Sequence, residues 1–90
     1  MSIGVFDSGI GGLTVLKTLI TNYPNNEYIY FGDTINLPYG NKTKEQLKEL
    51  AIKDVEFLIN KKVDIIIIAC GTVSSNCKEF LTNKYDIKIV

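Results

Sequence analysis

Asp64-Ile65-Ile66-Ile67-Ile68-Ala69-Cys70-Gly71-Thr72 is the stretch of sequence that decides the fold. Four consecutive isoleucines favour a strand, and a run with no polar alternation is typical of strands buried on both faces of a parallel sheet. We therefore predict a strand over residues 64–69. Cys70, Gly71 and Thr72 would then follow at its carboxyl end, directly before a helix over about residues 73–82.

The rest of the chain alternates in the same way between strand and helix patterns. Strands are predicted over residues 3–6 and 28–31 and from about residue 87, and helices over 13–21 and 43–60. The first helix carries Leu13, Leu16 and Ile20 on one face, and the second opens with a capping box from Thr43 to Gln46. Such alternation predicts right-handed βαβ units and a three-layer α/β fold with a parallel sheet, in the strand order 2-1-3-4.

This order makes the first and third strands neighbours at the point where the chain reverses its direction across the sheet. Ligands of open α/β sheets bind outside the carboxyl ends of the strands at that point. Asp7 and Ser8 follow the first strand, and Cys70 follows the third. The two segments richest in reactive side chains should therefore lie together.

Composition narrows the chemistry further. The 90 residues hold ten lysines against ten acids, with no arginine and no histidine, so imidazole bases and bidentate arginine clamps are excluded. The zero net charge argues against nucleic acid as a partner. We see no membrane span and no signal peptide, and so expect a cytoplasmic protein with both cysteines as thiols and no metal site. The strand opening at residues 87–90 suggests that the working protein is longer.

The glycine-rich segment from Asp7 to Gly12 allows three interpretations. It could be an ordinary tight turn, or it could bind a dinucleotide, with Asp33 as the ribose-binding acid. The fingerprint is imperfect, because Thr14 stands at the third glycine position. Asp7 would also repel a pyrophosphate but attract an ammonium group, while the start of the following helix could hold a carboxylate. An amino acid offers both groups.

Cys70 is the candidate reactive residue, as a base or as a nucleophile. A cysteine after an apolar strand is often a small core residue. Its neighbours Gly71, Thr72 and Ser74 are small or hydroxylated, however, and a helix N-terminus favours the thiolate form. Cys77 lies on the apolar stripe of the same helix and is predicted to belong to the core.

The loop over residues 32–40 contains Pro38, Tyr39 and Gly40. These residues would form an ordinary turn, or they would line a substrate pocket through backbone or hydroxyl contacts. The lysines are predicted to lie on solvated helix faces and ends.

Three segments resemble glutamate racemases of the aspartate/glutamate racemase family, in order and over nearly the whole chain. They are GVFDSGIGGLTVL (residues 4–16), YFGDT with LPYGNK (30–34 and 37–42), and IACGT (68–72). The resemblance implies that residues 1–90 are the N-terminal domain, incomplete here, of a two-domain racemase. It implies interconversion of L- and D-glutamate without pyridoxal phosphate or another cofactor, which supplies D-glutamate for peptidoglycan and cell shape.

Residue by residue, the resemblance makes Cys70 the base for one face of Cα, with Asp7 assisting. Substrate contacts fall to Asp7, Ser8, Pro38, Tyr39, Gly40, Gly71 and Thr72. The family usually has asparagine where this chain has Gly71, and its second cysteine, in a Cys-Thr-His segment, lies beyond residue 90. The expected partner is the small molecule glutamate, and we expect neither nucleic acid nor a membrane as a partner. A homodimer is compatible with the resemblance.

Three alternatives stay open at this point. A racemase of a related amino acid, such as aspartate, would share the general fold. A nucleotide- or phosphate-binding α/β module would use the glycine-rich turn, and a non-catalytic half-domain would use neither site.

Overall fold

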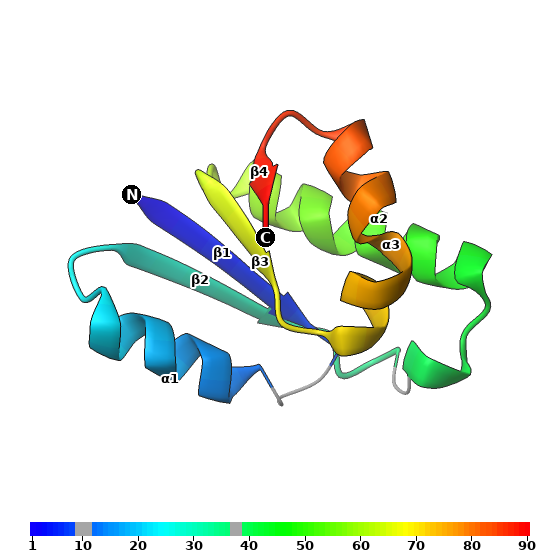
Figure 1. Cartoon of the computed structure of the whole chain (residues 1–90), viewed down its shortest axis with the longest axis horizontal. Helices are drawn as coiled ribbons and strands as arrows, with labels where there is room; N and C mark the ends of the chain where they lie inside the picture. Colours follow the sequence, from blue (N-terminus) through cyan, green and yellow to red (C-terminus); the bar gives the residue numbers. More distant parts are fainter. Residues whose placement is uncertain (9–11, 37–38) are drawn as a thin grey trace.

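The computed structural model describes residues 1–8, 12–36 and 39–90 of the chain. Strands and helices alternate along it (Figure 1). The elements are β1 (Ser2–Asp7), α1 (Leu13–Asn22), β2 (Glu27–Gly32), the 3-10 helix η1 (Tyr39–Asn41), α2 (Lys44–Asn60), β3 (Ile65–Ile68), α3 (Gly71–Lys84) and β4 (Lys88–Ile89). All pairings are parallel, and the strand order β2-β1-β3-β4 confirms the predicted order.

The main core lies between the sheet and the two long helices α2 and α3. Phe6 of β1 and Ile66 of β3 are fully buried there, against Leu58 of α2 and Leu81 of α3. Each such side chain contributes about 1.5–3 kcal/mol to folding by leaving water. The capping box that starts α2 is present as predicted, because the Thr43 hydroxyl accepts from the backbone N–H of Gln46 and the Gln46 side chain accepts from that of Thr43.

The opposite face of the sheet is covered less completely, and the expectation of a strand buried on both faces fails there. Figure 1 shows α1 alone on that side, with α2 and α3 together on the other. Leu13 and Ile20 of α1 are exposed rather than buried, at 47% and 45%. On β3 only Ile66 and Ile68 are buried, while the alternate isoleucines are half-buried. A single helix of ten residues is too small to cover this face.

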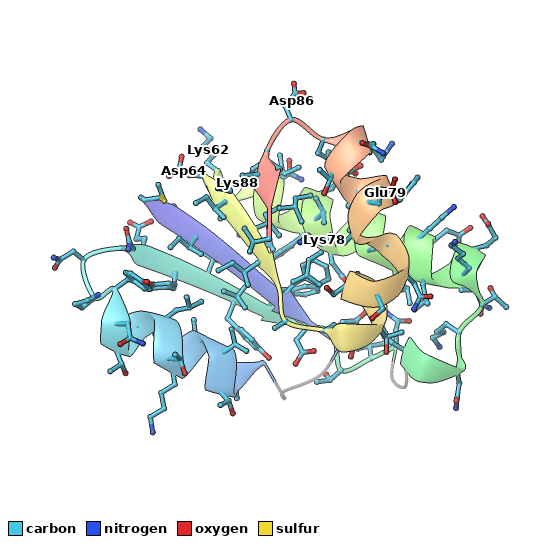
Figure 2. All side chains as sticks on the ribbon, in the orientation of Figure 1. Lys62, Asp64, Lys78, Glu79, Asp86 and Lys88 are labelled. Atoms are coloured by element: carbon cyan, nitrogen blue, oxygen red, sulfur yellow. The ribbon has the colours of Figure 1, made fainter. Side chains whose placement is uncertain are left out.

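None of the helices in the described part of the chain is long and apolar enough to cross a membrane. The carboxyl ends of β1, β2 and β3 converge at one edge of the sheet, from which α1, η1 and α3 follow (Figure 1). Lys62, Asp64 and Asp86 lie at the other end of the strands (Figure 2). The candidate site therefore has to be sought at the carboxyl edge.

Close packing of β1 against α2 predicts that Gly4→Ala destabilises the chain. A Cβ atom at Gly4 would lie 3.1 Å from Leu58 and 3.3 Å from Val63, so both side chains would have to shift. Overpacking of this kind costs about 1–3 kcal/mol. Urea unfolding should detect this loss. Gly71→Ala is the matched control, because a Cβ there meets nothing within 4 Å; an equal loss in both variants would contradict the packing argument.

Candidate active site

Cys70 and Ser8 meet where β1 and β3 end. The two strands run in register with Phe6 opposite Ile68, and the backbone N–H of Ala69 donates to the Phe6 carbonyl at 2.8 Å. This pairing places the residues that follow each strand side by side. The Cys70 thiol donates a hydrogen bond to the Ser8 hydroxyl oxygen, with 3.3 Å between Sγ and Oγ.

Cys70 is also the N-cap residue of α3. Its backbone is extended, and its carbonyl oxygen accepts from the backbone N–H of Ser74 at 2.9 Å. The thiol group therefore lies at the positive end of a helix of 14 residues. Cys70 is 4% exposed. Gly71 and Thr72 form the first turn of this helix, where their backbone N–H groups have no partner within the helix.

Asp7 ends β1, and its carboxylate binds the backbone on both sides of residues 9–11. One carboxylate oxygen accepts from the backbone N–H of Ser8 at 2.7 Å, and the other accepts from that of Gly12, directly before α1. Gly12 is required there, because a Cβ atom would lie 2.9 Å from the Ala69 Cβ. Asp7 is buried. On the neighbouring strand the pKa of Tyr30 is raised, first by the burial of Tyr30 itself and second by the negative charge of Asp7.

The predicted substrate loop divides into two parts. Gly40 is exposed, and a Cβ atom there would meet nothing within 4 Å. Tyr39 is 2% exposed, and its hydroxyl points to two buried carboxylates, at 2.6 Å from Asp33 and 2.9 Å from Asp54. The hydroxyl is therefore not directed to a substrate, and the Tyr39 carbonyl oxygen already accepts from the backbone N–H of Lys42 at 3.0 Å. Pro38 lies outside the described residues.

Asp33 and Asp54 are the buried carboxylates that sequence reasoning missed as a pair. Its position after the second strand indicates Asp33 only as a ribose-binding acid. Asp54 lies on the apolar stripe of α2, beside Ala51 and Val55, where a carboxylate is unexpected. That break in the stripe was the available signal.

Cys77 occupies the core position predicted for it. It is fully buried on α3 with Val73 and Leu81, and burial raises the pKa of its thiol, although Lys48 and Lys44 oppose the shift. Both cysteines are free. Within residues 1–8, 12–36 and 39–90 no group of cysteines and acids is arranged to hold a metal ion.

Two hollows on the surface lie away from the thiol. The first is lined by Asn36, Lys42, Gln46, Glu49, Leu50 and Lys53, and the second by Lys44, Lys48, Asn76, Glu79, Phe80 and Asn83. Neither includes Cys70, Ser8 or Asp7. Cys70 thus lies at the carboxyl end of an inner strand of the sheet and outside both hollows.

Comparison with known proteins matches the whole chain to about a third of the length of glutamate racemases. No model of a known protein family matches the chain. The glutamate racemases of Hydrogenobaculum sp. and Clostridium novyi are each 50% identical to it, and in both cases the match covers 100% of this chain and 35% of the relative. The chain thus spans about a third of the length of the curated relatives it matches.

Solved structures agree with the sequence matches. Glutamate racemase from Aquifex pyrophilus superposes with a TM-score of 0.96 at 40% identity, over 99% of this chain and 35% of that one. The enzyme from Francisella tularensis, solved in complex with D-glutamate, gives 0.92 at 43% identity, over 99% and 34%. In sequence and in fold, the chain corresponds to the N-terminal portion of the glutamate racemases.

Proposed function

We propose that residues 1–90 form the N-terminal domain of a cofactor-independent glutamate racemase, a cytoplasmic enzyme that supplies D-glutamate for peptidoglycan. The observation that carries this proposal is the thiol of Cys70 beside the Ser8 hydroxyl, at the carboxyl edge of a parallel sheet. The similarity of the whole chain to glutamate racemases supports the substrate. A second domain would lie in the two-thirds of the relatives that the chain does not span, and a homodimer stays a prediction.

In the proposed reaction, the thiolate of Cys70 removes the proton from Cα of one enantiomer. The electron pair of that C–H bond stays on the substrate as a carbanion, and an acid on the opposite face returns a proton to Cα. The opposing acid would be the second cysteine implied by the resemblance, outside these 90 residues. Cys77 does not fit this role, because it is buried in the core on a different turn of α3.

The surroundings of Cys70 suit the charged groups of an amino acid. The backbone N–H groups of Gly71 and Thr72, which have no partner within α3, offer donors for a carboxylate. Asp7 and Ser8 would face the ammonium group. Gly71 provides no side-chain amide, and the space beside it leaves room for water or a different substrate contact.

A nucleotide-binding function has less support. The backbone N–H groups of Ser8 and Gly12 are, among the described residues, donors that a phosphate in the glycine-rich turn would use. Both already donate to the Asp7 carboxylate, whose negative charge would repel a phosphate. An aspartate-type racemase remains the alternative substrate class.

Replacing Cys70 by serine should strongly slow racemisation in the full-length enzyme. A serine hydroxyl is far less acidic than a thiol, so we expect kcat in either direction to fall by at least about a hundredfold. Polarimetry or circular dichroism of glutamate would measure the rate. Unchanged turnover would remove Cys70 from the mechanism and favour a structural role.

Two controls accompany this experiment. Cys77→Ala should lose stability rather than kcat, because it alters only the buried side of α3. The 90-residue chain alone should not racemise, because it provides one thiol at the edge and not two. Turnover by the purified chain would contradict the two-cysteine proposal.

Gly40→Ala should separate substrate contact from folding. The new methyl group would meet nothing in the described chain within 4 Å, so the melting temperature should stay within about 2 °C of the parent. If Gly40 lines the substrate site, the thermal shift produced by D-glutamate should decrease. NAD and ATP serve as control ligands, and an unchanged D-glutamate shift would exclude Gly40 from the site.

A further inference from the structure

Asp33, Tyr39 and Asp54 form a buried cluster that the proposed reaction does not use. They come from the loop after β2, from η1 and from the middle of α2. The Tyr39 hydroxyl lies between carboxylate oxygens of the two aspartates, at 2.6 Å from Asp33 and 2.9 Å from Asp54. All three residues are buried, at 6%, 2% and 3% exposure in chain order.

Two ionised carboxylates and one hydroxyl would have one hydrogen too few for the two short contacts of this cluster. A tyrosine hydroxyl carries one hydrogen and can donate it to one acceptor. If both carboxylates were ionised, one of the two short contacts would bring lone pairs together without a hydrogen between them. The geometry is satisfied when one carboxyl group keeps its own proton and donates it to the tyrosine oxygen.

Asp54 is the residue that holds the proton at pH values below about 6. Asp33 accepts three further contacts from Asn36, one from the backbone N–H and two from the side-chain amide, at 2.9–3.2 Å. All of these are donors, which favour an ionised Asp33, and hydrogen bonds from Tyr39 and Asn36 lower the pKa of Asp33 although burial opposes them. Among the described residues, the hydrogen-bond partner of the Asp54 carboxyl is Tyr39.

The electrostatic surroundings agree with this assignment. Desolvation is the largest influence on Asp54 and raises its pKa to about 6. The negative charge of Asp33 acts in the same direction, while the Tyr39 hydrogen bond and Lys53 oppose it. Burial and the two carboxylates raise the pKa of Tyr39 strongly, so its hydroxyl stays protonated.

The cluster is tied directly to the candidate active site. The backbone N–H of Asp33 donates to the carbonyl oxygen of Asp7 at 2.9 Å, which extends the pairing of β2 with β1. Tyr39 begins η1, whose next residue is Gly40, and its ring belongs to the same buried cluster as Cys70. Movement of Tyr39 would therefore displace Gly40 relative to Asp7 and Cys70.

We propose that Asp54 is a positioning residue, whose protonated carboxyl donates to Tyr39 while Tyr39 donates to Asp33, and that this chain of hydrogen bonds holds η1 at the substrate site. The proposal rests on the proposed function only in so far as η1 lines that site. Loss of the Asp54 proton places two negative charges about one hydroxyl and weakens the hold on η1.

The direction of the pH dependence follows from the raised pKa. A carboxyl group whose pKa is higher in the folded than in the unfolded chain binds more protons when folded. The stability that Asp54 contributes is therefore complete below about pH 4, the ordinary value, and is lost as pH rises through about 6. Asp33 has a lowered pKa, so its contribution is present above its ordinary value and is lost only at lower pH.

Asp54→Asn in the full-length enzyme is the central test. Asparagine is nearly the same size, cannot ionise, and can donate from its amide to the tyrosine oxygen. We expect the melting temperature of the parent to fall relative to Asp54→Asn as pH rises from about 4 to about 7. Asp86→Asn, an exposed aspartate at the far end of the sheet, is the matched control and should follow the parent (Figure 2). A pH-independent difference between parent and Asp54→Asn would overturn the shared-proton chain.

The positioning role requires a second readout. The ratio of KM for D-glutamate in the parent to KM in Asp54→Asn should increase severalfold, with a midpoint near pH 6, because the variant keeps η1 in place. Other ionisations of enzyme and substrate are shared and cancel in this ratio. A melting difference that depends on pH with a constant KM ratio would leave the hydrogen-bond chain intact and overturn its role at the site.

A third variant separates the outcomes. Asp54→Ala removes the hydrogen bond as well as the charge, so its KM should exceed that of Asp54→Asn at every pH. Equal KM values in the two variants would contradict the hydrogen bond as the positioning contact. If the full-length protein bound no amino acid at all, the proposed function would fail, but the melting experiment would still decide the fate of the Asp54 proton.

Discussion

The parallel pairing of β1 with β3 is the constraint on which the candidate site depends. Phe6 lies opposite Ile68, and the backbone N–H of the next residue, Ala69, donates to the Phe6 carbonyl oxygen. A change of register by one residue would turn the buried isoleucines to the other face of the sheet and separate Ser8 from Cys70. The apolar core on the α2 and α3 side thereby determines which polar residues meet at the edge. The pairs of residues between β1 and β3 therefore determine both the packing of the core and the contact between Ser8 and Cys70.

Around this edge, buried carboxylates organise the loops. Asp7 accepts from the backbone N–H groups of Ser8 and Gly12 and so links the end of β1 to the start of α1. Asp33 accepts from Asn36 and Tyr39, and its own N–H continues the sheet to Asp7. Burial of an ionised group is costly unless such partners are present. Hydrogen bonds to buried carboxylates therefore stabilise the loops, whereas apolar packing stabilises the strands.

Much of the fold follows from the sequence because the patterns agree with one another. The isoleucine run, the Thr43 capping box and the alternation of elements all favour one parallel sheet, and the structure has that sheet in the predicted order. The exposure of Leu13 and Ile20 could not be predicted, because it depends on how much of the sheet a single helix covers. Periodicity identifies an apolar face but not whether anything packs against it.

The candidate site was predictable only in part. Topology brings Ser8 and Cys70 together, so their contact could be expected from the positions of two strand ends. The inward direction of the Tyr39 hydroxyl could not, since it requires Asp33 and Asp54, which lie 21 positions apart in the sequence. Hydrogen-bond networks among residues from three elements leave little trace in a local pattern. A polar residue on an apolar helix face is the trace that Asp54 does leave.

The central claim is that Cys70 moves the proton at one face of Cα. Exchange of the Cα hydrogen of each glutamate enantiomer in deuterium oxide, followed by proton NMR with the full-length Cys70→Ser variant, tests it most directly. If Cys70 is one of two opposed bases, the variant should lose exchange of the enantiomer that Cys70 deprotonates and keep some exchange of the other. Undiminished exchange of both enantiomers would contradict the account.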